Sequence, residues 1–217
     1  MELILTSDLH GALPVIPACD LFIIAGDICP IDNHDLDHQA NWLHEQFAAW
    51  LAEVPARYKV FIAGNHDVVF EQMPELVDLN RIPGIYLQDS GCQIEGVSIW
   101  GSPWARELPG WPFTANEDRL ARHWAKINRD TEVLVVHGPP YGYGDRVERR
   151  PTGNDCVGSR SLLAIIDQLP RLTLVVFGHI HEGTGVYDYN GITFVNASLM
   201  NKQYQPVNPL RTLRLRL

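Results

Sequence analysis

The sequence has few cysteines, and none of them form a close pair. Cys19, Cys29, Cys92 and Cys156 lie far apart and make no CxxC motif. A disulfide scaffold or a zinc ribbon needs cysteines at short spacing, so the sequence argues against both classes. We therefore expect reduced thiols and a cytoplasmic protein.

Long apolar runs are also missing. No stretch approaches the roughly 18 consecutive apolar residues of a membrane-spanning helix. The segment Met1–Thr6 lacks the basic region and cleavage site of a signal peptide. We expect neither secretion nor a membrane partner.

Basic residues are outnumbered by acidic ones. Lys and Arg total 17 against 26 for Asp and Glu, which gives a net charge of −9 at pH 7. Such a chain is poorly suited to track a nucleic-acid backbone, so no stable nucleic-acid binding is expected. With 46% hydrophobic and 20% charged residues in 217, the composition is that of a globular protein, and we expect one domain over residues 1–217.

Short aliphatic runs predict buried strands. Each run is too short for a helix and nearly continuous in apolar character, as is typical of a strand covered on both faces. The five runs occupy residues 3–6, 21–25, 59–63, 133–136 and 172–177.

Helical patterns alternate with these runs. Apolar spacing predicts a helix at about 36–54, a second around 116–127 and a third around 162–169. Hairpin patterns at 92–101 and 186–195 and an alternating tail at 210–217 indicate antiparallel strands of a second sheet. The fold class is therefore α/β, with largely parallel or mixed sheets.

Polar side chains follow each of the five buried runs. The run ends read Ser7-Asp8-Leu9-His10, Gly26-Asp27, Gly64-Asn65-His66-Asp67, His137-Gly138 and Gly178-His179-Ile180-His181. In an open α/β sheet, ligands bind beyond the carboxyl ends of the strands, so these side chains are expected to converge. Carboxylate, imidazole and amide oxygen together suit Mn, Fe, Zn, Ni or Mg.

The number of these side chains points to two metal ions. Seven of them are potential ligands, more than one tetrahedral ion takes and suited to two ions that share a carboxylate. The seven are Asp8, His10, Asp27, Asn65, His137, His179 and His181.

The other histidines and the tryptophans are expected to be structural. His34, His38, His44 and His123 fall in loop or helix stretches away from the strand ends. We expect Trp100, Trp104 and Trp111 to cover the core, with a place in a cleft wall as the alternative.

A loop at 141–158 leaves two interpretations open. It follows His137 and carries Tyr141, Tyr143, Arg146, Arg149 and Arg150. Such a basic and aromatic loop would stack a base and attract an anion, or it would simply be a solvated surface loop.

Taken in order, the five motif blocks resemble the calcineurin-like metallophosphoesterases over roughly residues 3–200. Within that family the chain is most similar to the small metallophosphoesterase-domain-containing, fetal-brain-protein-like phosphodiesterases and their bacterial relatives. The segments that carry this likeness are Ala25-Gly26-Asp27-Ile28-Cys29, His137-Gly138-Pro139-Pro140-Tyr141-Gly142, 177–183 and 194–198.

The resemblance implies a four-layer α-β-β-α sandwich with a dinuclear metal centre at one edge of the sheets. It places Asp8, His10, Asp27 and His181 on one divalent ion and Asp27, Asn65, His137 and His179 on the other, with Mn²⁺ favoured over Fe, Zn, Ni or Mg. It also implies two catalytic residues. His66 would steady the phosphorus and protonate the leaving oxygen. Asp67 would orient His66 or anchor its loop, unless it caps a helix over 68–73.

The implied function is that of a phosphohydrolase dependent on two metal ions. We expect a phosphodiesterase on small or nucleotide phosphodiesters, cyclic nucleotides included, acting through in-line attack of a metal-bound hydroxide. The alternatives are a phosphomonoesterase of the same fold and a non-catalytic binding scaffold. The sequence leaves the oligomeric state open.

Two related classes fit less well. Ser/Thr phosphatases follow their Gly-Asp with Asp-Arg-Gly and use Gly-Asn-His-Glu, whereas Ile28 follows Asp27 here and Asp67 follows His66. DNA repair nucleases of this superfamily share Gly-Asn-His-Asp but carry further domains and a DNA-binding surface, which a 217-residue chain of charge −9 does not suggest.

Overall fold

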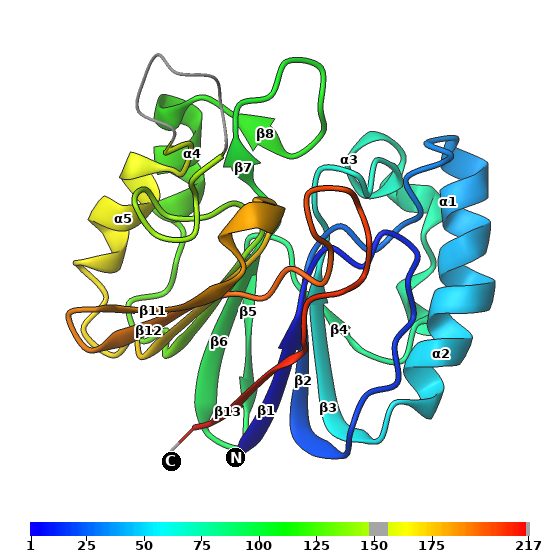
Figure 1. Cartoon of the computed structure of the whole chain (residues 1–217), viewed down its shortest axis with the longest axis horizontal. Coiled ribbons are helices and arrows are strands. Elements are labelled where there is room, and N and C mark those ends of the chain that lie inside the picture. Colours follow the sequence, from blue (N-terminus) through cyan, green and yellow to red (C-terminus); the bar gives the residue numbers. More distant parts are fainter. Residues whose placement is uncertain (148–155, 216–217) are drawn as a thin grey trace.

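The computed structural model describes residues 1–147 and 156–215. Its centre is a pair of mixed β-sheets that pack face to face (Figure 1). The first sheet has the order β13 (Arg211–Arg214), β1 (Glu2–Thr6), β2 (Cys19–Ala25), β3 (Ala56–Ile62) and β4 (Ile85–Tyr86). The strands β1 to β4 run parallel, and β13 pairs antiparallel with β1. The alternating tail thus forms a strand, but the expectation that it belongs to the second sheet is wrong, because its strand extends the first sheet beside β1.

The second sheet is also mixed. Its order is β11 (Gly185–Tyr189), β12 (Ile192–Asn196), β10 (Leu174–Phe177), β9 (Val133–Val136), β6 (Val97–Ser102) and β5 (Ser90–Ile94). Both predicted hairpins are confirmed, because β5 pairs antiparallel with β6 and β11 with β12. A small separate pair joins β7 (Ala105–Arg106) to β8 (Thr114–Ala115).

Alternation along the strands divides the core into layers. Leu3 and Leu5 of β1 belong to a buried cluster that also contains Val133 and Val135 of β9, and this cluster fills the space between the sheets. Ile4, between them, belongs instead to a cluster with helix residues. Successive side chains of a strand point to opposite faces, so each sheet buries one face on its partner and the other under helices.

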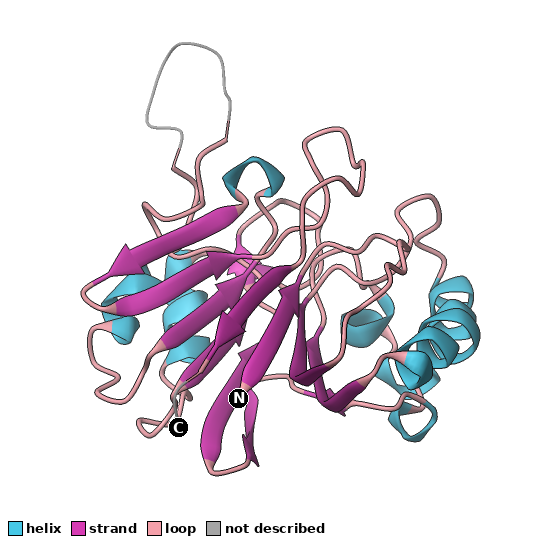
Figure 2. Cartoon of the chain, turned by 60° about the horizontal axis from the view of Figure 1, so that its bottom comes forward, coloured by secondary structure: helices cyan, strands magenta, loops and turns pink. Residues whose placement is uncertain are grey.

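Helices cover both outer faces, as Figure 2 shows. On the first sheet lie α1 (Leu36–Trp42), η1 (Leu43–Phe47), α2 (Ala48–Glu53), α3 (Val69–Gln72), η2 (Pro74–Leu76) and η3 (Leu79–Arg81). On the second lie α4 (Glu117–Trp124) and α5 (Arg160–Ile166), and η4 (His181–Gly183) follows β10. The predicted α/β fold of two mixed sheets flanked by helices is confirmed.

The helix expected at 36–54 differs in its middle turn. It runs continuously from α1 to α2, but η1 is a π-helical turn. His44 belongs to this turn, and its Nε2 accepts a hydrogen bond of 2.9 Å from the backbone N–H of Asp78, which lies outside the turn. His44 therefore has the structural role expected of it. No helix in the described ranges is long and apolar enough to cross a membrane.

Candidate metal centre

The carboxyl ends of β1, β2, β3, β9 and β10 meet at one edge of the two sheets, toward the top of Figure 1. Hydrogen bonds connect the loops that follow them. The backbone N–H of His179 donates to both carboxylate oxygens of Asp8, at 3.1 and 3.0 Å. Nδ1 of His137 lies 2.9 Å from the carbonyl oxygen of Ala25. The site is thus assembled from both sheets.

The predicted ligands converge in overlapping groups. In each group, the ligand atoms lie within 4.8 Å of one another. The groups are Asp8 with His10 and His181, His10 with Asp27 and His66, and Asp27 with His137 and His179. Oδ1 of Asn65 lies 3.1 Å from Nε2 of His137, which adds Asn65 to the third group. The structure therefore brings all seven predicted ligands together, with Asp27 central among them.

The backbone is strained at four of the predicted ligands. Asp8, His10, Asp27 and His179 have φ values of 54°, 45°, 53° and 67°, in the left-handed region that side chains other than glycine seldom adopt. Each such residue costs of order 1–3 kcal/mol, and strain of this kind clusters at functional sites.

Two motif glycines are required by close approach. A Cβ on Gly64 would lie 2.3 Å from Oδ1 of Asp27, and one on Gly178 would lie 2.2 Å from Oδ2 of Asp8. Only glycine lets these loops lie against the two carboxylates.

The site concentrates negative charge in a buried position. Burial by itself would raise the pKa of Asp8 and of Asp27, but the neighbouring imidazoles of His181 and His137 outweigh burial and hold both pKa values below the ordinary range. Both carboxylates are therefore ionised, and they favour positive charge beside them.

The pKa values of the buried histidines shift in opposite directions. Burial lowers the pKa of His10 and of His179 to about 4, so both are neutral at pH 7. For His137, burial is outweighed by the charge of Asp27, which raises its pKa to about 9. Neutral imidazole is the form that ligates a metal.

The residues present fit metal ions. His10 is 8% exposed, and neither of its ring nitrogens has a hydrogen-bond partner. Its Nε2 lies 3.7 Å from Oδ2 of Asp27, beyond hydrogen-bond distance. A buried imidazole without a partner is costly unless its nitrogen binds something else, and a divalent cation would satisfy it. Nδ1 of His181 lies 3.0 Å from the carbonyl oxygen of Asn201, the kind of outer contact that orients a ligating histidine.

His66 stands at the edge of the ligand groups. Its backbone N–H donates to Oδ1 of Asp27 at 2.8 Å, and its ring lies edge-on to that of His10, with centroids 4.8 Å apart. Burial lowers the pKa of His66, with the charge of Asp27 acting against it.

Asp67 lies beneath the ligands and holds their loops. It is fully buried, and its carboxylate accepts hydrogen bonds from the backbone N–H groups of Ile28, Cys29 and Gly64. Burial, followed by the charge of Asp27, raises the pKa of Asp67 to about 6. Of the roles considered for Asp67, the contacts support the loop anchor. They do not support the helix cap, because α3 begins without a side-chain cap.

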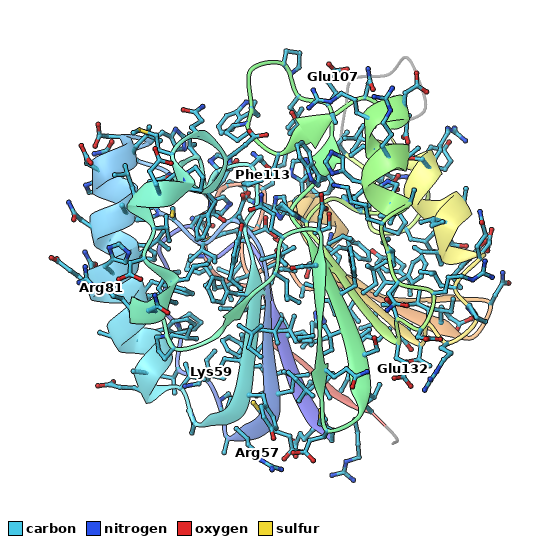
Figure 3. The ribbon with its side chains drawn as sticks, turned by 180° about the vertical axis from the view of Figure 1, so that it is seen from behind. Arg57, Lys59, Arg81, Glu107, Phe113 and Glu132 are labelled. Carbon is cyan, nitrogen blue, oxygen red and sulfur yellow. The ribbon has the colours of Figure 1, made fainter. Side chains whose placement is uncertain are left out.

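A pocket of about 580 Å³ opens over the ligands. Asp27, Asn65, His66, His179 and His181 form its floor. Its wall combines charged side chains (Arg106, Glu107, Glu182 and Lys202) with apolar and aromatic ones (Leu108, Trp111, Val147, Val157, Ile180 and Tyr204). Figure 3 shows Glu107 at the outer edge of the molecule and Phe113 farther in, at the two ends of the loop that carries Trp111.

Sequence reasoning assigned no functional role to His34 or Tyr204, and it left a place in a cleft wall as the alternative for Trp111. Nε2 of His34 lies 3.2 Å from Nδ1 of His66, although His34 was expected to be structural. Trp111 lines the pocket, with its ring centroid 4.4 Å from that of His66, whereas Trp104 is buried as expected. Tyr204 lies 5.0 Å from His10 and 4.9 Å from His181 between ring centroids. Only the placement of Trp111 in a long loop hinted at a cleft.

The loop at 141–158 lies at the site only in part. Val147 and Val157 line the pocket. Tyr143 packs on Tyr189 and Phe194, and the ring of Tyr141 lies under Arg160 at 3.5 Å, so both rings make contacts within the protein. Arg149 and Arg150 lie outside the described residues.

Comparison with known proteins agrees with this geometry. The family model of calcineurin-like phosphoesterases matches residues 1–183. Metallophosphoesterase domain-containing protein 1 of Homo sapiens is 35% identical over 229 residues, which cover 94% of this chain and 67% of that protein. A UPF0046 protein of Caenorhabditis elegans is 32% identical and covers 94% of this chain and 72% of its own length.

A solved structure shares the fold at lower identity. It is that of a candidate 5′-nucleotidase from Staphylococcus aureus, with a TM-score of 0.54 and 15% identity. The match covers 90% of this chain and 48% of that chain. The expected family likeness is confirmed. The matched segment ends at residue 183, so it does not include Tyr204.

Proposed function

Because the chain belongs to the calcineurin-like phosphoesterase family, we propose that it is a phosphodiesterase that cleaves small phosphodiesters, nucleotides among them, with two divalent metal ions. The observation that carries the proposal is the convergence of seven metal-type ligands around Asp27 beneath one pocket.

The ligand groups suggest how the two ions would be held. Asp8, His10, Asp27 and His181 would hold one, and Asp27, Asn65, His137 and His179 would hold the other. Imidazole suits Zn, Fe and Ni, whereas carboxylate suits Mg and Mn, so the mixed donor set accepts each candidate metal. The family resemblance favours Mn²⁺ among them. When bound, the ions would offset charge on the phosphoryl oxygens and activate water. The four cysteines, all of them described residues, form no disulfide, which supports a cytoplasmic location.

The protein's own residues would complete the reaction. Hydrolysis breaks the bond between phosphorus and the leaving oxygen, and that oxygen needs a proton. His66 lines the pocket beside Asp27 and would donate this proton. Asp67 would act through its hydrogen bonds, which hold the backbone beside Asp27 and His66 in place.

The pocket wall favours a diester over a monoester. Among the described residues, Arg106 and Lys202 are balanced there by Glu107 and Glu182, so this part of the wall adds no net positive charge to that of the metals. A diester carries one negative charge and a monoester carries close to two. The apolar part of the wall would receive the ester substituents.

The proposal is tested with bis-p-nitrophenyl phosphate and p-nitrophenyl phosphate side by side. Metal-stripped protein is reloaded with Mn²⁺, Ni²⁺ or Mg²⁺. We expect faster diester cleavage, with a loss on the order of 100-fold in Asp27→Ala. The loss in His66→Ala should be smaller, because p-nitrophenolate leaves with little help from an acid, and His38→Ala, at an exposed histidine outside the pocket, should lose nothing. Faster monoester cleavage would make the protein a phosphatase. No cleavage by folded, metal-loaded protein would favour a binding scaffold.

A further inference from the structure

The imidazole of His34 pairs with that of His66, which lines the pocket. Nε2 of His34 lies 3.2 Å from Nδ1 of His66, and the ring centroids are 5.3 Å apart. At this distance one nitrogen donates a proton and the other accepts it. The direction of this hydrogen bond therefore decides which nitrogen of neutral His66 carries its proton.

The segment around His34 is built to hold it in place. Oδ1 of Asn33 accepts a hydrogen bond of 2.9 Å from the backbone N–H of Asp35. Oδ1 of Asp35 accepts one of 2.9 Å from His38 and caps α1. These two bonds order the backbone on both sides of His34, just before α1 begins. The side chain of His34 therefore extends from an ordered segment.

His66 is fixed through its backbone and covered over its ring. Its N–H donates to Asp27, and its carbonyl oxygen accepts a hydrogen bond of 2.7 Å from Nε2 of Gln39, a fully buried residue of α1. The ring of Trp111 packs on both imidazoles, with centroids 5.5 Å from His34 and 4.4 Å from His66. These contacts fix the position of His66 but not which ring nitrogen carries its proton. His34 can fix that, because it is the hydrogen-bond partner of Nδ1 of His66.

We propose that His34 is a positioning residue whose Nε2 accepts a hydrogen bond from Nδ1–H of His66, which leaves Nε2 of His66 as the nitrogen that serves the substrate. This inference rests on the proposed hydrolysis. His66 enters this step protonated on both nitrogens. When the bond to the leaving group breaks, its electron pair stays on the leaving oxygen, the Nε2 proton joins that oxygen, and His66 is left neutral in its Nδ1–H form. His66 keeps its Nδ1 proton, donated to His34 throughout, so His34 is unchanged by the step. A base or acid oriented by a third group is a recurrent catalytic arrangement.

The first test reads the proton directly. In Mg²⁺-loaded protein labelled with ¹⁵N-histidine, two-bond ¹H–¹⁵N correlations distinguish the two tautomers of neutral His66. We expect Nδ1–H in the wild type and in His34→Gln, whose amide oxygen can accept the same bond. In His34→Ala we expect a mixture of tautomers. A wild-type His66 with its proton on Nε2 would overturn the inference.

The second test uses two leaving groups. Methyl p-nitrophenyl phosphate releases a weakly basic phenolate that needs little help from an acid, whereas methyl phenyl phosphate releases a more basic one. His34→Ala should lose about tenfold or more in kcat on the phenyl ester and little on the nitrophenyl ester, with KM unchanged. His34→Gln should recover most of this loss, and His38→Ala should behave as wild type.

The outcomes separate the inference from the proposed function. An equal loss on both esters, or no loss on either, would contradict the role of His34 while leaving the hydrolase intact. If the wild type cleaves neither ester with any metal, the proposed function fails, and the tautomer of His66 still decides whether His34 holds its Nδ1 proton.

Discussion

The backbone N–H of Cys29 donates a hydrogen bond of 2.7 Å to Oδ1 of Asp67. Ile28 and Gly64 donate to the same carboxylate at 2.9 and 2.8 Å. One buried side chain thus joins the loop after β2, which carries Asp27, to the loop after β3, which carries Asn65 and His66.

Replacing Asp67 should destabilise the whole protein. Asp67→Ala leaves three buried N–H groups without their acceptor, and each such group costs about 1–3 kcal/mol. We expect the free energy of unfolding in urea to fall by about 3 kcal/mol or more, and kcat to fall with it. Asp32→Ala, at an exposed position, is the control. An unchanged urea midpoint for Asp67→Ala would contradict the anchoring role.

Gly64→Ala should damage the metal site without a change in any ligand. The added Cβ would lie 2.3 Å from Oδ1 and 2.6 Å from the backbone nitrogen of Asp27, so either the loop or Asp27 must move. A displacement of about 1 Å costs on the order of 100-fold in rate. We expect a loss of this size in diester hydrolysis, and less bound metal by elemental analysis.

The control for that variant is Gly84→Ala. There the added Cβ lies 3.3 Å from side-chain atoms of Leu51 and Phe61, which can adjust. Metal content and rate should stay near wild type. If Gly64→Ala also kept the metal content and rate of the wild type, the close approach of its loop to Asp27 would not be needed for activity or metal binding.

The convergence of the seven candidate ligands was predictable because the apolar runs, and the polar residues that end them, are local features of the sequence. Each of the five aliphatic runs forms a strand, and parallel strands bring their carboxyl ends to one edge. Asp8 and His179 are 171 positions apart, yet both follow such runs and therefore meet.

His34 and Tyr204 were not predictable for the opposite reason. Both lie in polar connecting segments with no apolar periodicity to place them. His34 reaches His66 because α1 begins beside the loop after β3, a tertiary contact that no local spacing encodes. Tyr204 has a φ of 56°, and the turn around it is set by the side chain of Asn201, which accepts hydrogen bonds from the N–H groups of Gln203 and Gln205.

Metal ions should stabilise the folded protein in addition to supporting its activity. The native state would gain the binding free energy, about 2.7 kcal/mol at a metal concentration 100 times Kd. For a chain of this size that corresponds to a rise in Tm of about 5–10 °C. Calorimetry with Mn²⁺ and then with a chelator measures it. His10→Ala should show a smaller rise, because it removes one ligand, and His38→Ala should show the full rise. A Tm that does not respond to metal would contradict a metal site at Asp27.

A charged cluster around Asp89 should make the stability of the protein depend on pH in the acid range. Oδ2 of Asp89 lies 2.6 Å from Nδ1 of His123 and 2.9 Å from Nζ of Lys126, and Oδ1 accepts a hydrogen bond of 2.7 Å from Ser102. Burial alone would raise the pKa of Asp89, but these three hydrogen bonds outweigh it and lower that pKa. A carboxyl whose pKa is lower in the folded state adds stability above its unfolded pKa, and that stability is lost as the pH falls through the folded value.

Asp89→Asn isolates this contribution. Asparagine tolerates the φ of 45° at this position, so the backbone is kept while the charge is removed. We expect the variant to be less stable than wild type by about 2 kcal/mol between pH 5 and 7, and the difference to shrink below about pH 4. Urea unfolding in chelator at each pH measures it, since the metal ligands titrate in both proteins and cancel in the difference. A difference that stays constant down to pH 2 would mean that Asp89 contributes through its shape and not through its charge.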